Sequence, residues 1–216
     1  SWHKRSGDGP WTLYKMQYAA DQSDVYLGLR AGVHLLGHVR YRQAAEKLER
    51  QVPRLLFDRD RRAFGIALTP EGRLDPPDEG WCGYFVQGYL AWAFGSHDET
   101  RDGLKWLRSR QNDDGGFRQR SDQPAYSLSA AIFCLGADRL DRYGSERDRS
   151  LRWLRDLAIS PRGGIRDFGH PQAPVYSNLA GWVVAAWASA PPFPTSKPPE
   201  SDAPVWGWRV RSWHTP

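Results

Sequence analysis

A segment of about fifty residues repeats along this chain, and one or two glycines mark where each copy ends. Residues 104–117 read LKWLRSRQNDDGGF, and residues 151–165 read LRWLRDLAISPRGGI. Both copies place apolar residues at helical spacing and continue through a polar stretch into Gly-Gly, and residues 48–65 hold a weaker copy. Glycine tolerates the positive φ that a chain needs when it leaves a helix and reverses. The repeat therefore predicts an array of helix pairs.

The segments between the loops alternate in character. Four are apolar nearly all round, which predicts buried inner helices; they cover residues 25–36, 81–94, 126–135 and 176–187. Three are amphipathic and charged, which predicts outer helices; they cover residues 41–56, 98–111 and 145–158. Asp21-Gln-Ser-Asp24 is a start signal for the first inner helix. We therefore expect an all-α fold, an α/α toroid-like array of about three to four helix hairpins with one layer of helices inside the other.

Prolines set the end of the repeat region. Residues 191–194 (Pro-Pro-Phe-Pro) and 197–200 (Lys-Pro-Pro-Glu) stop helix formation. We expect a single α/α repeat domain over residues 1–190 and a Pro- and Trp-rich C-terminal arm over residues 191–216. Residues 1–10 are polar, and they are expected to be irregular.

The chain of 216 residues is rich in aromatic side chains, with 11 Trp, 9 Tyr and 8 Phe. Large rings can act as spacers between helices or can line a cavity with apolar walls and negative π faces, and both interpretations stay open. The formal net charge is +5, but basic residues alternate with acidic ones, as they do between residues 139 and 149. That alternation is typical of a solvated helix face, so no nucleic-acid partner is expected.

Signals for a membrane or for export are missing from the sequence. No apolar run approaches the ~18 residues of a membrane span, so no transmembrane segment is expected. No basic-apolar-small export pattern is visible at the start, and two cysteines do not make a disulfide framework. A cytoplasmic location is expected, with a membrane-peripheral one as the alternative.

One copy of the repeat points to a known superfamily. Trp106-Leu107, followed by Gln111, Gly115 and Phe117, resembles the repeat of squalene and oxidosqualene cyclases, whose superfamily includes protein prenyltransferase β-subunits. The resemblance implies an α/α toroid in which Gln111 caps a helix end and ties neighbouring hairpins together. A full toroid of this kind has more hairpins than three or four. The chain would therefore form an incomplete or small barrel, or a homo-oligomer would close the ring.

The acidic motifs of such cyclases, Asp-x-Asp-Asp and Asp-Asp-x-x-Asp, do not occur in this sequence. The densest cluster of reactive side chains lies instead at residues 75–84. There Asp78 and Glu79 precede an inner helix, where they serve either as a general acid and base or as helix caps. Cys82 lies at the start of the same helix, whose positive end could activate it as a nucleophile.

The first residues of the inner helices gather at one rim if those helices share one orientation. Asp24, Asp78 and Glu79 are the candidate catalytic acids of that rim, and N-capping is the alternative role for Asp21 and Asp24. The candidate substrate-binding residues are Asp21, Tyr26, Trp81, Tyr84, Tyr126, Tyr176 and Trp182.

Trp81-Cys82-Gly83 resembles a Trp-Cys segment of lanthionine synthetase cyclases, which are α/α toroids with a Cys-Cys-His zinc site. A catalytic zinc needs three protein ligands, and Cys82, Cys134 and His170 are the candidates here. The adjacent Cys-His pair of that family is missing, and Cys134 falls in an apolar helix, as is typical of a small buried residue. We therefore expect neither a metal nor another cofactor.

These patterns predict an enzyme of the terpenoid cyclase and prenyltransferase-like superfamily that acts on an apolar or isoprenoid substrate in an aromatic-lined cavity. One alternative is a carbohydrate-active α/α-barrel enzyme, a hydrolase, lyase or epimerase that uses the same acids on a glycan. The other alternative is a non-catalytic module that presents its helical surface to a protein partner.

Overall fold

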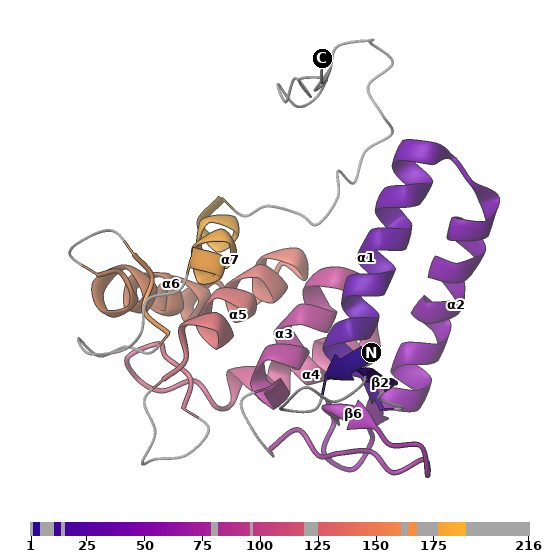
Figure 1. The fold of residues 1–216 in the computed structure, drawn as a ribbon. Helices are drawn as coiled ribbons and strands as arrows, with labels where there is room; N and C mark the ends of the chain where they lie inside the picture. The colour runs from indigo at the N-terminus through magenta and orange to yellow at the C-terminus, as the bar shows by residue number, and fades with distance from the viewer. Residues whose placement is uncertain are drawn as a thin grey trace, which may run out of the picture.

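The computed structural model describes residues 2–4, 11–13, 16–78, 82–95, 97–118, 125–160, 164–167 and 177–188. Seven α-helices follow one another in this part of the chain (Figure 1). They are α1 (Ala19–Leu36), α2 (Val39–Leu56), α3 (Cys82–Phe94), α4 (Asp98–Arg108), α5 (Ser127–Arg139), α6 (Gly144–Trp153) and α7 (Ser177–Ala188). A π-helical turn, η1 (Leu154–Ala158), extends α6. No helix in the described ranges has the length and apolarity needed to cross a membrane.

The helices form the two layers that the sequence predicts. Helices α1, α3, α5 and α7 pack side by side, and α2, α4 and α6 each pack against the inner helix that precedes them. The inner helices α3 and α5 are apolar nearly all round, and every residue in the ranges 83–91 and 129–137 is buried. The all-α fold, with three complete hairpins and a fourth inner helix, is confirmed.

Short antiparallel pairs connect each outer helix to the next inner one. After α2, strand β4 (Phe57–Asp58) pairs with β5 (Ala63–Phe64). At the same position in the next two repeats, single bridges join Gln111 to Phe117 and Ile159 to Ile165. The repeat read from the sequence is therefore a repeat of structure.

Two further strand pairs lie at the N-terminal side. Strand β1 (Trp2–Lys4) pairs with β2 (Trp11–Leu13), where an irregular segment was expected. Strand β3 (Gln17–Tyr18) pairs with β6 (Ala67–Leu68) and leads directly into α1. The backbone N–H of Ala19 donates to the Ile66 carbonyl at 2.9 Å. Helix α1 therefore starts before the predicted Asp21–Asp24 signal, because a tertiary contact satisfies its first donor, and the N-capping role for those two acids is wrong.

Gln111 has the tying role that the cyclase-like repeat implies. Its Nε2 donates to the carbonyl of Glu146 and to Oγ of Ser150, both at 2.8 Å, and its Oε1 accepts from Arg149 at 2.8 Å. All three partners belong to α6. One amide side chain thus joins the end of the second hairpin to the third.

The Gly-Gly pair after Gln111 lets the loop pass close to α6. Gly115 has φ of +99°. A Cβ at Gly115 would lie 2.4 Å from the carbonyl oxygen of Arg149, a contact that no side chain can make. The glycine is therefore required both by its backbone conformation and by the close approach of the next outer helix.

We expect Gly88→Ala to destabilise the fold by about 1–3 kcal/mol, because overpacking forces the backbones apart. A Cβ on Gly88 in α3 would lie 2.4 Å from Cγ2 of Ile132 in α5 and 2.8 Å from its carbonyl oxygen. Gly28→Ala in α1 is the matched control, since nothing lies within 4 Å of its Cβ position. The control should be neutral or slightly stabilising. Urea unfolding followed by circular dichroism measures both, and equal effects would contradict the packing account.

The ion pair between α4 and α6 should make stability fall in acid. Hydrogen bonds from Ser145 and from the Arg108 guanidinium lower the pKa of the Glu146 carboxyl to about 2. A lowered folded-state pKa gives stability that is complete above the usual carboxyl value of 4.5 and is lost as the pH falls towards 2. We expect Glu146→Gln to lower the free energy of unfolding by roughly 2 kcal/mol near neutral pH, and by progressively less in acid. If the loss in the free energy of unfolding does not change with pH, the charge of the Glu146 carboxylate is not its cause.

Candidate functional site

Four aromatic rings form one cluster where α7 packs across α3. Phe85, Tyr89 and Trp92 lie at spacings of four and three residues, so they share one face of α3. Trp182 of α7 meets all three edge-on, with centroid distances of 6.2, 5.4 and 5.7 Å respectively. Trp92 and Trp182 are half-buried. These four residues are called the aromatic cluster below.

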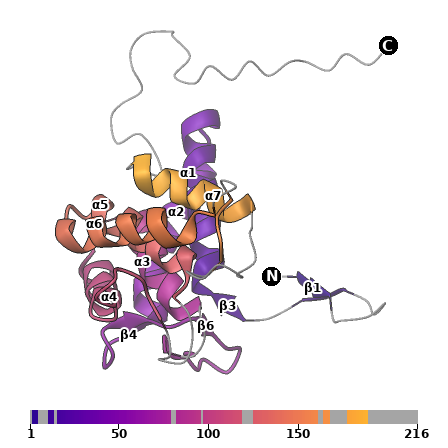
Figure 2. The same cartoon turned by 90° about the vertical axis from the view of Figure 1, so that its left-hand side faces the viewer.

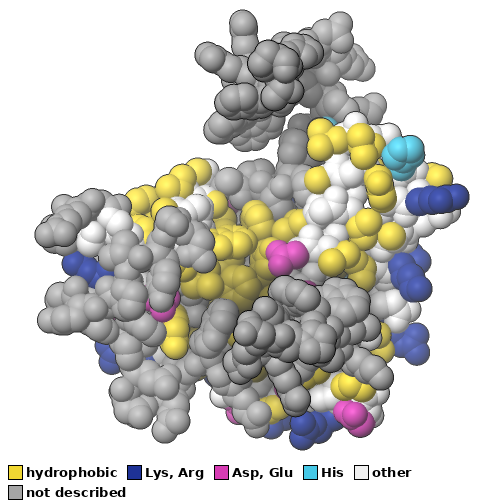
Figure 3. All heavy atoms as spheres, viewed as in Figure 1, with side chains coloured by type: hydrophobic (Ala, Val, Ile, Leu, Met, Phe, Trp, Pro, Cys, Tyr) yellow, Lys and Arg dark blue, Asp and Glu magenta, His cyan; other side chains and the backbone are white. Residues whose placement is uncertain are grey.

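A carboxylate borders this cluster. Asp24 in α1 is exposed and accepts a hydrogen bond from the hydroxyl of Tyr89. Burial and the neighbouring Asp24 charge raise the pKa of Tyr89 far above its usual value. The phenol therefore stays protonated and remains a donor to Asp24. Figure 3 shows hydrophobic side chains gathered between the α1–α2 hairpin and α7, with an acidic side chain among them.

A second group of titratable side chains lies at the starts of α3 and α5. Tyr126 precedes α5, and burial, Asp167 and Cys82 all raise the pKa of its phenol. Asp167 is held there by its backbone, because the Ser127 N–H donates to the Asp167 carbonyl at 2.9 Å. Burial raises the pKa of the Asp167 carboxyl. A carboxyl of this kind keeps its proton at higher pH than an ordinary aspartate.

Two of the predicted substrate-binding residues are buried in the core. Tyr26 stacks on Phe94 with ring centroids 4.3 Å apart and is 4% exposed. Tyr84 is 5% exposed and donates its hydroxyl hydrogen to the Arg118 carbonyl at 3.3 Å. Both rings join helices together in the described part of the chain.

The remaining predicted residues lie at several places in the fold or outside the described residues. Asp21 is partly buried in the first turn of α1, and Asp78 is exposed and pairs with Arg61 at 3.5 Å. Tyr126 and Trp182 lie in the two groups described above. Glu79, Trp81, His170 and Tyr176 lie outside the described residues, as does the predicted arm over 191–216.

The predicted zinc ligands do not form a cluster in the part of the chain that the structure describes. No group of three His, Cys, Asp or Glu side chains there could hold a metal ion. Cys134 is fully buried inside α5, and burial raises the pKa of its thiol to about 12. Cys82 is half-buried, and burial raises the pKa of its thiol too.

Sequence reasoning missed Tyr89, Trp92, Phe85 and Asp167. The three aromatics have helical spacing, but the helix is apolar nearly all round, so its sequence does not indicate which face meets Asp24. Asp167 follows a Gly-Gly loop, and its role depends on a backbone contact with Ser127. Alignment of the three loops gives no signal for Asp167, because Leu68 and Gln119 occupy the equivalent positions.

No family model matches this sequence, and no curated protein matches it. Solved structures do match its fold. A possible GH105 family member from Klebsiella pneumoniae aligns with a TM-score of 0.58 and 16% identity over 81% of this chain and 55% of its own. A possible GH105 family member from Salmonella enterica aligns with a TM-score of 0.62 and 14% identity, over 81% of this chain and 56% of its own. Cellobiose 2-epimerase from Bacillus thermoamylovorans aligns with a TM-score of 0.58 and 8% identity, over 82% of this chain and 57% of its own.

These matches place the chain in a class of folds. The chain has an α/α-toroid fold, and it spans slightly more than half the length of the structures just named. Those structures are carbohydrate-active enzymes rather than terpenoid cyclases. The α/α toroid that the sequence implies is therefore confirmed.

The two thiols should react slowly with iodoacetamide. Burial raises the pKa of both, so we expect Cys82 to react more slowly than a free thiol at neutral pH, and Cys134 only after unfolding. Mass spectrometry of labelled protein, with Cys82→Ser as the assignment control, measures the rates. Rapid labelling of Cys82 near neutral pH would show instead that the helix start activates it as a nucleophile.

Proposed function

We propose that this chain is part of a carbohydrate-active α/α-barrel enzyme and that a glycan binds beside the aromatic cluster. The observation that carries the proposal is the Asp24–Tyr89 hydrogen bond at the edge of four aromatic rings. The carbohydrate-active enzymes that share the fold support it.

The chemistry of the two components suits a sugar. A pyranose presents a face of C–H groups that can stack on the half-buried rings of Trp92 and Trp182. Its hydroxyl groups can donate to the exposed carboxylate of Asp24. The protonated hydroxyl of Tyr89 occupies one acceptor site of that carboxylate and fixes its orientation.

Asp24 and Asp167 are the acids that we assign to catalysis. Glycoside hydrolysis uses a carboxylate and a protonated carboxyl, and lyases and epimerases likewise need a positioned base and acid. We assign the acid role to Asp167, because burial raises the pKa of its carboxyl above the usual aspartate value. Asp24 suits the base or nucleophile role. Asp78 and Glu79, in the loop before α3, remain predicted catalytic acids.

An isoprenoid substrate is the second candidate. The aromatic cluster offers π faces that could stabilise a cation, and the Gln111 tie is shared with the cyclase-like repeat. An isoprenoid would contact the aromatic rings but not the Asp24 carboxylate that borders them, whereas a glycan would contact both. A non-catalytic interaction module is the third candidate, and it needs neither acid.

We expect turnover of oligosaccharides, with cellobiose and uronic-acid-containing oligosaccharides as the first probes, and none of polyprenyl diphosphates. Asp24→Asn and Asp167→Asn should each lower kcat by at least about a hundredfold, because each removes an acid or base. Product analysis by chromatography measures turnover. Activity confined to polyprenyl diphosphates would support the isoprenoid candidate instead, and a partner protein without turnover would support the module.

Matched variants separate the acids from surface charge. Asp98→Asn removes an exposed carboxylate of α4 whose side chain is 91% exposed, and activity should be unchanged. The double variant Asp78→Asn with Glu79→Gln tests the predicted acids of the loop before α3. Full activity in Asp24→Asn and loss in the double variant would move the catalytic role to that loop.

A further inference from the structure

The α1–α2 hairpin extends well beyond the other helices. Helices α1 and α2 have 18 residues each, whereas α3 has 13 and α4 has 11. Tyr26 stacks on Phe94, the last residue of α3, and α1 continues for ten residues past Tyr26. At 1.5 Å per residue those ten residues rise about 15 Å. Both ribbon views show the free end of the hairpin standing clear of α3, α5 and α7 (Figures 1 and 2).

The free end is apolar and exposed. Every residue from 34 to 42, called the hairpin tip below, is exposed. Leu35, Leu36 and Val39 are 76%, 61% and 60% exposed, which is unusual for aliphatic side chains of one short turn. Figure 3 shows hydrophobic, histidine and basic side chains together at this end of the molecule. Burying these side chains would be favourable, so the tip is a candidate contact surface.

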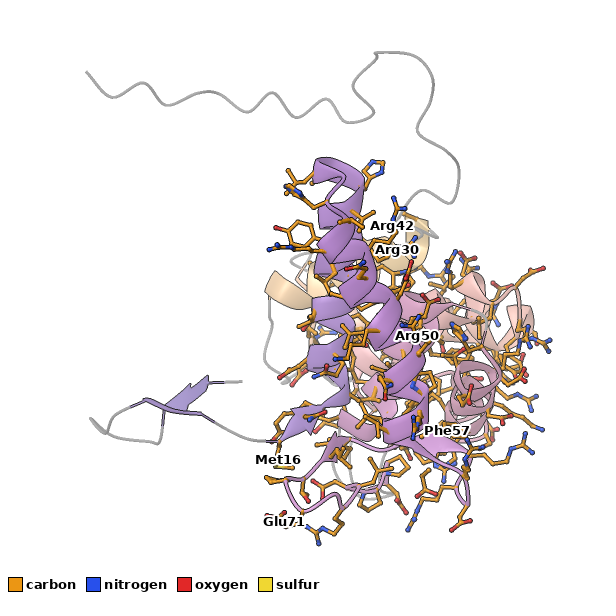
Figure 4. The ribbon with its side chains drawn as sticks, turned by 90° about the vertical axis from the view of Figure 1, so that its right-hand side faces the viewer. Met16, Arg30, Arg42, Arg50, Phe57 and Glu71 are labelled. Atoms are coloured by element: carbon orange, nitrogen blue, oxygen red, sulfur yellow. The ribbon has the colours of Figure 1, made fainter. Side chains whose placement is uncertain are left out.

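The charge of the hairpin tip is entirely positive. Residues 25–45 contain three arginines and no aspartate or glutamate, in a chain that has 25 acidic residues. Arg40 and Arg42 lie in the tip, and neither has an acidic partner among the described residues. Figure 4 shows Arg42 towards the free end of the hairpin and Phe57 at the opposite end. An anionic surface is therefore the complementary partner.

The turn that carries these side chains has a defined shape. Gly37 ends α1 in the left-handed conformation, with φ of +67°, and its N–H donates to the Val33 carbonyl at 3.0 Å. The ring of Tyr41 lies so close to Gly32 that a Cβ there would approach it to 2.9 Å. The rings of His38 and Tyr41 meet edge to face with centroids 5.6 Å apart. The exposed aliphatic groups are thus presented on a folded turn.

Two other occupants fit these features less well. A neighbouring hairpin of ordinary length, which would extend the toroid beyond α1, would end level with α3 and leave the tip uncovered. A second copy docked tip to tip would bring Arg40 and Arg42 against the same charges. A bilayer with anionic lipids accepts aliphatic side chains into its boundary region and attracts arginines to its headgroups.

We propose that the hairpin tip docks on an anionic lipid surface. Leu35, Leu36 and Val39 enter the boundary of the hydrocarbon region, and Arg40 and Arg42 lie at the headgroups. The contact would orient the whole α/α array on a membrane, and it does not depend on the proposed glycan chemistry.

Co-sedimentation with lipid vesicles tests this proposal directly. We expect the full chain to bind vesicles that contain phosphatidylglycerol, to bind pure phosphatidylcholine vesicles far more weakly, and to lose affinity as salt increases. Replacing Arg40 and Arg42 with Gln should weaken binding roughly thirtyfold, since each arginine near such a surface contributes about a fivefold factor. Replacing Leu35, Leu36 and Val39 with Ser should weaken it by at least about tenfold.

Leu55→Ser is the matched control, because Leu55 is an aliphatic residue of the same hairpin that is 45% exposed but lies near its other end. Its binding should equal that of the unchanged chain. Circular dichroism of every variant confirms that the hairpin is folded. Absence of binding to anionic vesicles would overturn the proposal. Equal losses of vesicle binding in the triple Ser variant of the tip and in Leu55→Ser would also overturn it. A dimer in sedimentation equilibrium that only the tip variant loses would also overturn it, in favour of a contact between copies.

Discussion

The contact between α3 and α5 holds the inner layer together, and the other helices are placed relative to it. Gly88 and Gly136 face one another across this contact, and a Cβ on Gly136 would lie 3.0 Å from the Gly88 carbonyl oxygen. Ile132 packs directly against Gly88, and Ala91 packs against Gly136, so the two glycines allow the close approach. Both helices are therefore buried over most of their length, and the charged outer helices cover them on one side.

Polar side chains fix how successive hairpins follow one another. Gln111 joins the second hairpin to the third, and the buried Gln87 makes a comparable tie, accepting from the Phe64 N–H and donating to the Phe64 carbonyl at 2.8 and 2.7 Å. An apolar contact can slide at small cost, whereas these bonds are lost if a hairpin shifts. The packing contact thus supplies the burial, and the amides supply the register on which the Asp24–Tyr89 pair depends.

The same arrangement separates two surfaces of the molecule. Side chains of α1, α3 and α7 meet in the aromatic cluster with Asp24 at its edge, where the proposed glycan would bind. The length of α1 and α2 carries the hairpin tip away from that site, so lipid contact and glycan contact would use different parts of one hairpin. A barrel bound in this way would meet its substrate at a fixed orientation to the surface.

The sequence by itself determined the helical repeat, the alternation of inner and outer helices and the tie made by Gln111, because periodicity and local motifs express these directly. It did not determine where α1 begins, since the pairing of β3 with β6 set that start. It placed Tyr26 and Tyr84 at a substrate rim, whereas packing buried both. The sequence did not indicate Tyr89 or Asp167 as site residues, because their positions depend on tertiary contacts. In a helix that is apolar nearly all round, only the tertiary structure decides which face meets an acid, because the partner comes from a distant helix and leaves no pattern in the local sequence.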